Sequence, residues 1–351
     1  MSLSIVRYPK TQNRSLKAWS AADELSLEYL QEENLQNNVT LYNDRFGYLS
    51  CHIPDSVTVC VYKSQEKAII ENYKLNNLGD FNPISLFDKI KAIEFAIISM
   101  PKSLDLFEYY LQHICLNSAK DVTVVCSFMT RHFTKRILEI ASKYFEITEQ
   151  SKAKKKARLL ILKNKKQVRE DDLINQIHFN EVDFKQFYGV FSAKNIDYAS
   201  QFFVENLIIK DTDQNILDLA SGNGVLAYFT QKQNPKANIH LLDDFELAIE
   251  SSKLNLTDGT VHYHYNDSLN HFEDSYFDLI ISNPPFHFEH ENNIEVSLGL
   301  FEQVSNKLNA VGRFQLVANT HLNYKTHLSK IFSQVNVIAE NDKFVVYECL
   351  K

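Results

Sequence analysis

Short apolar runs recur through the second half of the chain, and each of them ends in polar residues. Four of these runs are bounded by turn residues and predict buried β-strands, because strands of a parallel sheet are covered on both faces. The residues from Val225 onward predict a helix between the first two strands. Strands that alternate with helices predict an α/β fold with a parallel sheet. The four predicted strands are Ile216–Leu219, Ile239–Leu242, Val261–Tyr265 and Phe277–Ser282.

Acidic and amide side chains end the first three strands, and ligands of an open parallel sheet bind at the carboxyl ends of its strands. Two glycines after the first strand would let the backbone approach a ligand at an electropositive helix N-terminus. A dinucleotide site is the rival interpretation, but Ala220 occupies the position of its first glycine. The acid after the second strand can accept both ribose hydroxyls of a nucleoside cofactor. For each acid taken alone, a helix cap or a solvated loop end is the alternative. The order of the polar strand ends favours S-adenosylmethionine over NAD, with Asp218, Gly222, Asn223, Gly224, Asp243, Asn266 and Asp267 as its predicted contacts.

The fourth strand leads into Asn283-Pro284-Pro285-Phe286, a tetrad suited to methylation of a planar amino group. The lone pair of such an amine is delocalised into its ring, so the nitrogen is a poor nucleophile. The Asn283 amide oxygen and the Pro284 carbonyl can each accept one N–H bond and free the lone pair, while the prolines stiffen the loop. The Phe286 ring offers a face for a flat base. The alternative is a rigid turn with a buried phenylalanine.

Segments of the first half of the chain resemble segments of the second half that lie about half the chain length further on. Glu94–Met100 resembles Asp278–Asn283, and Ala157–Leu162 resembles Phe344–Cys349. We therefore predict two similar α/β domains, residues 1–170 and 171–351, with a charged boundary, although chance similarity between α/β domains is the alternative. In this alignment Met100 stands in place of Asn283, so the first copy should lack catalytic activity. A hairpin over 177–190 and an amphipathic helix over 197–208 should begin the second domain.

Composition narrows the possible partners. The net charge of −7 argues against a generic nucleic-acid binder, but nine Lys or Arg residues lie between Lys152 and Arg169. A concentrated basic patch can neutralise phosphates whatever the net charge, and a solvated strand edge is the alternative. We predict RNA contacts by Lys154, Lys155, Lys156 and Arg158. Five scattered cysteines suit a reducing cytoplasm, and neither a signal peptide nor a bilayer-spanning run is expected. His287 and His290 lack companions, so no metal site is expected.

With these motifs in hand, the chain resembles the ribosomal RNA large subunit methyltransferase G family along nearly its whole length. Its second half carries Val190-Phe191-Ser192, Asp197, Asp218-Leu219, Gly222-Asn223-Gly224, Asn283-Pro284-Pro285-Phe286-His287, Val317-Ala318-Asn319, His321-Leu322 and Lys343-Phe344-Val345-Val346. Its first half carries Arg7-Tyr8-Pro9, Leu16-Lys17-Ala18-Trp19, Asn43-Asp44, Phe46-Gly47 and Lys155-Lys156-Ala157-Arg158. The chain departs from the family at Ala220-Ser221, where members carry Gly-Cys, at Ala199 in place of Gly, and at Thr320 in place of a basic residue.

The resemblance implies two tandem Rossmann-like class I methyltransferase domains, of which the N-terminal one is degenerate and serves RNA recognition. It implies transfer of a methyl group from S-adenosyl-L-methionine to the exocyclic N2 of a specific guanine in 23S rRNA, with Asn283, Pro284 and Phe286 as catalytic residues. It adds Phe191 to the cofactor contacts. We expect a cytoplasmic monomer that acts on protein-free RNA or an early assembly intermediate, without a membrane. Methylation of 16S rRNA, glutamine methylation of a protein, and a non-catalytic RNA-binding or ribosome assembly factor on the same fold are the alternatives.

Overall fold

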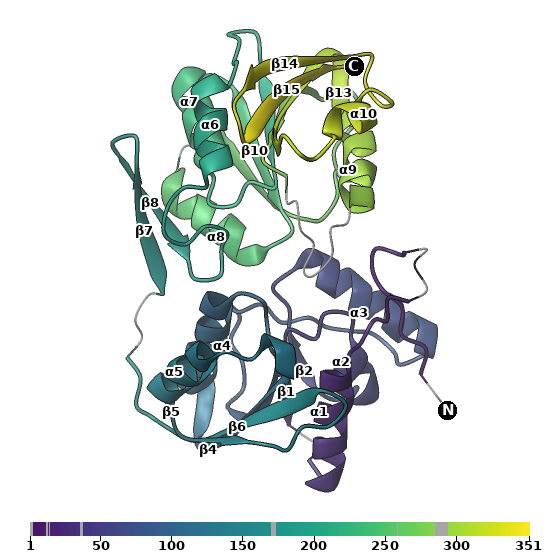
Figure 1. Cartoon of the computed structure of the whole chain (residues 1–351), viewed down its shortest axis with the longest axis vertical. Coiled ribbons are helices and arrows are strands. Elements are labelled where there is room, and N and C mark those ends of the chain that lie inside the picture. The colour runs from purple at the N-terminus through teal and green to yellow at the C-terminus, as the bar shows by residue number, and fades with distance from the viewer. Residues whose placement is uncertain are drawn as a thin grey trace. The chain divides into compact units, whose positions relative to one another are not determined.

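The computed structural model describes residues 3–11, 13, 15–35, 38–169, 173–257, 259–284 and 294–351, with the side chains of 294–298 left aside. The chain divides into two compact units, Met1–Leu173 and Ile174–Lys351 (Figure 1). Each unit is an α/β domain around one mainly parallel sheet, as the alternation of strands and helices predicts. No helix of the described residues is both long and apolar enough to cross a membrane.

The first unit is built on a six-stranded sheet of order β2-β1-β3-β4-β6-β5, in which β6 runs antiparallel to both of its neighbours. Its strands are β1 (Val39–Tyr42), β2 (Val57–Val59), β3 (Ile93–Ser99), β4 (Ser118–Met129), β5 (Phe145–Gln150) and β6 (Ala157–Lys165). Its helices are α1 (Ala21–Glu32), α2 (Tyr48–His52), α3 (Lys63–Asn76), α4 (Leu104–Asn117) and α5 (Lys135–Tyr144), with a 3-10 turn at Thr130–His132.

The second unit has a seven-stranded sheet of order β11-β10-β9-β12-β13-β15-β14, again with an antiparallel β15. Its strands are β9 (Asn215–Leu219), β10 (Asn238–Asp243), β11 (Val261–Tyr265), β12 (Phe277–Ser282), β13 (Leu308–Asn319), β14 (Gln334–Glu340) and β15 (Phe344–Leu350). Its helices are α6 (Tyr198–Asn206), α7 (Val225–Gln233), α8 (Glu246–Asn255), α9 (Ile294–Lys307) and α10 (Tyr324–Leu328). The predicted hairpin is present as β7 (Ile174–Phe179) and β8 (Val182–Phe187).

Two apolar clusters cover the two faces of this second sheet, because alternate residues of a strand point to opposite faces. Ile216 and Leu279 join Phe203 of α6 and Leu226 of α7 on one face. On the other face Leu217, Leu219, Phe277 and Ile280 pack with residues of α9 and α10. Figure 1 shows α6 and α7 on one side of the strands and α9 on the other. Both faces of β9 and β12 are therefore buried, and their polar ends emerge only at the carboxyl edge.

The order β2-β1-β3-β4-β6-β5 of the first sheet matches β10-β9-β12-β13-β15-β14 of the second, while β11 has no counterpart among the described strands of the first sheet. The fold therefore consists of two tandem Rossmann-like domains. Irregular pairing falls between Ile93 and Phe95 of β3 and between Phe277 and Leu279 of β12. These matched irregularities equate Ile93 with Phe277, and hence Ser99 with Asn283. The sequence alignment that placed Met100 opposite Asn283 was therefore wrong by one residue, because short apolar runs align equally well in two registers.

A second pair of asparagines supports the same equivalence of the two units. Asn72 of α3 donates to the carbonyl oxygen of Phe46, the residue before Gly47, at 2.8 Å. Asn255 of α8 donates to the carbonyl oxygen of Asn223, the residue before Gly224, also at 2.8 Å. Each asparagine thus ties its helix to a loop after a central strand of the sheet, the loop after β1 in the first unit and the loop after β9 in the second.

Candidate active site

The loop between β9 and α7 is held open by its backbone geometry. The N–H groups of Ala220 and Ser221 both donate to the carbonyl of Leu242 in β10, at 2.8 and 3.2 Å. Gly222 has a φ of +55°, and a Cβ added there would meet no atom within 4 Å. Gly224 has a φ of +81°, and a Cβ there would come within 2.7 Å of Leu256 Cδ1. Gly224 therefore serves helix packing, whereas Gly222 leaves space through which a ligand can approach the backbone.

Asp243 ends β10 beside this loop. Its Oδ2 accepts the N–H of Gly222 and its Oδ1 accepts the N–H of Phe245, both at 2.9 Å. Burial raises the pKa of this carboxyl to about 6, against the opposing effect of these two hydrogen bonds. Each carboxylate oxygen has two lone pairs, so the ionised group can still accept the hydroxyls of a ribose.

Asp218 lies deeper in β9 and is fully buried. Its Oδ2 accepts the N–H of Ala227 in the first turn of α7 at 3.0 Å. Its Oδ1 has no hydrogen-bond partner among the described residues, and neither has the buried Ser221 Oγ. Burial raises the pKa of the Asp218 carboxyl to about 7. Unsatisfied buried acceptors are costly, so the loop and the strand behind it fit a ligand that carries donors or positive charge.

The end of β11 is joined to the end of β10. The N–H of Asn266 donates to the carbonyl of Asp243 at 3.0 Å. The Asn266 side chain accepts the N–H of Asp267 at 2.9 Å and lies 3.1 Å from His271 Nδ1. Both predicted residues of this strand end are therefore brought to the same edge as Asp243.

Asn283 follows β12 and is fixed from the first turn of α6. Its Nδ2 donates to Ser200 Oγ at 2.8 Å and to Asp197 Oδ2 at 3.2 Å. An ionised carboxylate can only accept hydrogen bonds, so Asp197 determines which end of the amide carries the nitrogen. Asn283 Oδ1 is buried and has no hydrogen-bond partner among the described residues. The amide thus holds one oriented acceptor that the protein itself does not use.

The other predicted residues of the site differ in their surroundings. Pro284 is buried, while Phe286 lies outside the described residues. Asn223 is buried, and its side chain is engaged by Gln186 at 2.8 Å and by the N–H of Val225 at 3.3 Å. This geometry gives Asn223 a role in holding the loop to β8. Phe191 is 70% exposed, and its carbonyl accepts from Gln186.

Sequence reasoning missed the two residues that orient Asn283. Asp197 was predicted as the start of a helix and counted in the family resemblance, but it was given no role at the site; it caps α6 by accepting the N–H groups of Ala199 and Ser200. Ser200 carried no signal at all. The one available sign was the cap itself, because an Asp at a helix start near a strand end can serve two partners.

The first unit has lost the corresponding chemistry at three positions. The paired ends of β1 and β2, Tyr42 with Val59, correspond to Leu219 with Leu242, so Cys60 stands in place of Asp243. Ser99 stands in place of Asn283. Arg45 stands in place of Gly222, with its guanidinium carbon 5.3 Å from the centroid of the Tyr62 ring. A long side chain therefore lies where the second unit leaves open space, and the first unit is a degenerate copy.

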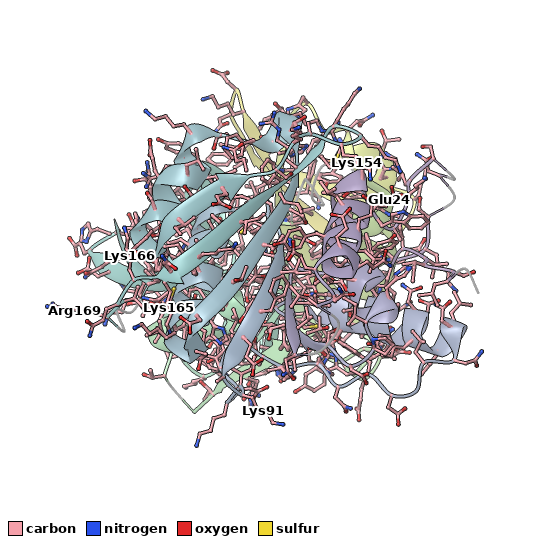
Figure 2. All side chains as sticks on the ribbon, turned by 90° about the horizontal axis from the view of Figure 1, so that it is seen from below. Glu24, Lys91, Lys154, Lys165, Lys166 and Arg169 are labelled. Carbon is pink, nitrogen blue, oxygen red and sulfur yellow. The ribbon has the colours of Figure 1, made fainter. Side chains whose placement is uncertain are left out.

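The predicted RNA-binding lysines lie at a tight turn between β5 and β6. Lys155 and Lys156 both have positive φ values, 49° and 63°. Lys154 pairs with Glu28 at 2.6 Å and Lys155 with Glu24 at 2.9 Å, although all of these side chains are partly exposed. Figure 2 shows Lys154 and Glu24 at one end of the strands, and Lys165, Lys166 and Arg169 at the other. Strand β6 therefore separates the basic run of the sequence into two groups.

Arg158 differs from these lysines because it lies within β6. Its Nη1 donates to Gln150 at 3.4 Å, and its Nε is buried without a hydrogen-bond partner among the described residues. Among the described residues no group of three or more His, Cys, Asp or Glu side chains could hold a metal ion, and the five cysteines are buried thiols.

Comparisons with known proteins agree with this architecture. Residues 181–348 match the Methyltransferase small domain, and residues 1–167 match the RLMG N-terminal domain. Ribosomal RNA large subunit methyltransferase G of Vibrio vulnificus strain YJ016 is 28% identical over 99% of this chain and 97% of its own length. The protein of the same name from Psychromonas ingrahamii is also 28% identical, over 100% and 97%.

Similarity to a solved structure extends over the whole chain. The T. thermophilus 16S rRNA N2 G1207 methyltransferase in complex with AdoMet and guanosine superposes with a TM-score of 0.76. It covers 100% of this chain and 98% of its own, at 17% identity. This similarity shows that the two-unit fold is shared.

The fold and the open loop beside Asp243 define a class I methyltransferase, with S-adenosylmethionine as its cofactor. The unsatisfied acceptors of Asp218 and Ser221 and the space at Gly222 fit a cationic nucleoside of this kind. The two matched domains together span nearly all of the sequence, and the chain belongs to the ribosomal RNA large subunit methyltransferase G family.

Proposed function

We propose that this chain transfers a methyl group from S-adenosyl-L-methionine to the exocyclic N2 of a specific guanine in 23S rRNA. One observation carries the proposal. Asn283 Oδ1 is a buried acceptor with no partner among the described residues, and its orientation is fixed by Asp197 and Ser200. An acceptor held in place beforehand needs no reorganisation when an amine begins to react.

The residues of the second unit divide the task. S-adenosylmethionine supplies the electrophilic methyl group. Asp243 would accept the ribose hydroxyls, Asn266 and Asp267 would contact the base of the cofactor, and Gly222 would let the backbone approach it. Asn283 Oδ1 would accept one N–H of the guanine amine and the Pro284 carbonyl the other. With both N–H bonds held, the nitrogen lone pair is freed from the ring system to bond to the methyl carbon, while the bond from that carbon to the cofactor sulfur breaks and S-adenosylhomocysteine is released. One amine proton is then lost to solvent.

The flat guanine needs an enclosing surface as well as hydrogen bonds. We assign base stacking to Phe286 on the sequence alone, and a cofactor contact to the exposed Phe191. Because the N2 amine of a paired guanine lies in a duplex groove, the target should be unpaired or flipped out before it reacts. Extraction costs a few kcal/mol and is cheapest in a loop.

The first unit, residues 1–170, would then hold the RNA. Lys154 and Lys155 are engaged by exposed ion pairs, which contribute little and can be exchanged for phosphates. Lys156 lies in the same turn, and Arg158 is the second residue of β6. The turn stores backbone strain, which is often found at functional sites. The chain would act as a cytoplasmic monomer on protein-free RNA or an early assembly intermediate.

Methyl transfer to two transcripts tests the substrate. The full chain is incubated with labelled S-adenosylmethionine and with protein-free transcripts of either 23S or 16S rRNA, and assembled large subunits serve as a third substrate. We expect label in the 23S transcript and little in the other two. Label in the 16S transcript would favour the small-subunit alternative. No label in any RNA, together with retained RNA binding, would favour a non-catalytic assembly factor.

A further inference from the structure

The two most exposed aromatic side chains of the described residues both flank the candidate site. Phe191 is 70% exposed and Tyr198 is 71% exposed. Single exposed apolar residues are ordinary, but two large rings beside one site are not a random scatter. Phe191 already has a proposed role at the cofactor, whereas Tyr198 has none.

Tyr198 is held close to Asn283 by the backbone. It is the first residue of α6 and directly follows Asp197, which bonds the Asn283 amide at 3.2 Å. The neighbouring Ala199 and Ser200 are buried. Tyr198 therefore stands in solvent on an anchored helix turn, so little conformational freedom would be lost when a planar ligand stacks on its ring.

Lys343 lies near the face of α6 that carries Tyr198. Phe202, one turn after Tyr198, has its ring centroid 6.4 Å from that of Phe344 at the start of β15. Residues i and i+4 of a helix share a face. Tyr198 therefore lies one turn further out, beyond the strand end, where Lys343 precedes Phe344.

Lys343 stands at a fixed point on this rim. Its carbonyl accepts the N–H of Thr320 at 3.0 Å, and Asn341 accepts the N–H groups of Lys343 and Phe344. The Lys343 side chain is exposed and forms no ion pair with any other described side chain. It differs in this from Lys154 and Lys155 of the first unit.

Lys343 of the second unit is structurally equivalent to a lysine of the first unit that is predicted to bind RNA. Ala157 pairs with Met129 as Phe344 pairs with Asn319. The carbonyl of Lys156 accepts the N–H of Thr130 at 2.8 Å, just as that of Lys343 accepts the N–H of Thr320. Lys156 and Lys343 are thus equivalent, and the catalytic unit carries its own lysine at the edge of the sheet where Asn283 lies.

We propose that Tyr198 and Lys343 form an RNA-contact rim on the catalytic unit. The Tyr198 ring stacks on the base next to the methylated guanine, and the Lys343 ammonium contacts a phosphate of the same unpaired segment. An aromatic face with a nearby cation fits single-stranded RNA, whose unstacked bases find a π-face and whose phosphates find a charge. The inference rests on the proposed function and names the part of the substrate that this unit holds.

The test compares four variants of the full chain with the wild type. Tyr198→Ala removes the ring, Tyr198→Phe keeps it, and Lys343→Ala removes the charge. Val311→Ala is the matched control. Val311 is an apolar residue, 85% exposed, and it lies in β13 two residues before Arg313, the partner of Leu279 in β12. A 23S rRNA transcript is the probe, and both its binding by anisotropy and its KM in methyl transfer are measured.

Tyr198→Ala should weaken RNA binding and raise the RNA KM roughly 10-fold, the scale of one stacked base, with kcat little changed. Tyr198→Phe and Val311→Ala should stay close to wild type. Lys343→Ala should reduce the slope of log affinity against log salt by about 0.7. The affinity for S-adenosylmethionine should be unchanged in all four, which separates a lost RNA contact from a displaced helix.

Unchanged RNA affinity in Tyr198→Ala, or a loss in Tyr198→Phe as large as in Tyr198→Ala, would overturn the stacking role. An unchanged salt slope in Lys343→Ala would overturn the phosphate contact. If the wild type binds the transcript but methylates no RNA, the proposed function fails, and the anisotropy comparison still decides the rim.

Discussion

The orientation of the Asn283 amide is the feature whose removal is most informative, and Ser200→Ala removes half of its support. The variant deletes the acceptor that lies 2.8 Å from Asn283 Nδ2 and leaves Asp197 at 3.2 Å. A hydrogen bond of this kind is worth about 0.5–1.5 kcal/mol net. If that free energy is lost only in the transition state, the rate falls by roughly 2- to 12-fold. Asn283→Ala, which deletes the acceptor oxygen itself, should lower the rate by roughly 10²–10³.

The assay is the single-turnover rate of methyl transfer at saturating RNA and cofactor. Ser200→Thr keeps a hydroxyl and should recover most of the rate. Ser26→Ala is the matched control, since Ser26 is also a buried helical serine, whose hydroxyl donates to the Ala22 carbonyl. S-adenosylmethionine affinity should be unchanged in all of these variants. Full rate in both Ser200→Ala and Asn283→Ala would show that the oriented acceptor has no part in the reaction.

Three further predictions concern the cofactor side. Ala220 has a φ of +60°, so Ala220→Gly should relieve about 1 kcal/mol of strain and raise the urea midpoint; a lower midpoint would show that the methyl group is needed for packing. Asp243→Ala should weaken S-adenosylmethionine binding by about 1–3 kcal/mol, and unchanged calorimetric affinity would remove Asp243 from the site. Burial raises the pKa of Asp218 to about 7, above its unfolded value. Its contribution to the free energy of unfolding is therefore fully present at acid pH and is lost as pH rises through about 7. Asp218→Asn should flatten this dependence between about pH 4 and about pH 7, and an equal slope in wild type and variant would contradict the assignment.

The strands and their polar ends could be predicted because both depend on local sequence. Fully apolar runs specify buried strands, and the order Asp243, Asn266 and Asn283 needs only the rule that parallel strands end at one edge. All four predicted strands are present as β9 to β12. Local patterns, however, do not fix a register, and the repeat was therefore misaligned by one residue at Ser99.

Contacts between residues far apart in the chain could not be predicted from the sequence. Asp197 and Ser200 lie 86 and 83 residues before Asn283, and apart from the helix cap at Asp197 nothing in their neighbourhood indicates that they orient its amide. Likewise, the basic run looks continuous in the sequence, but β6 carries its two groups to opposite ends of a strand. Asp218 was also predicted at the polar end of its strand. It is instead buried inside the sheet, and its Oδ1 has no hydrogen-bond partner among the described residues.

Nucleoside analysis of the methylated RNA identifies the atom that accepts the methyl group. The full chain is incubated with a protein-free 23S rRNA transcript and S-adenosylmethionine, the RNA is digested to nucleosides, and the methylated product is identified by mass spectrometry against standards. We expect one added methyl per transcript with the wild type, recovered as N2-methylguanosine, and a yield lower by roughly 10²–10³ at a matched short reaction time with Asn283→Ala. A methyl group on a ring nitrogen, on a ribose or on another base would show that the exocyclic N2 is not the acceptor.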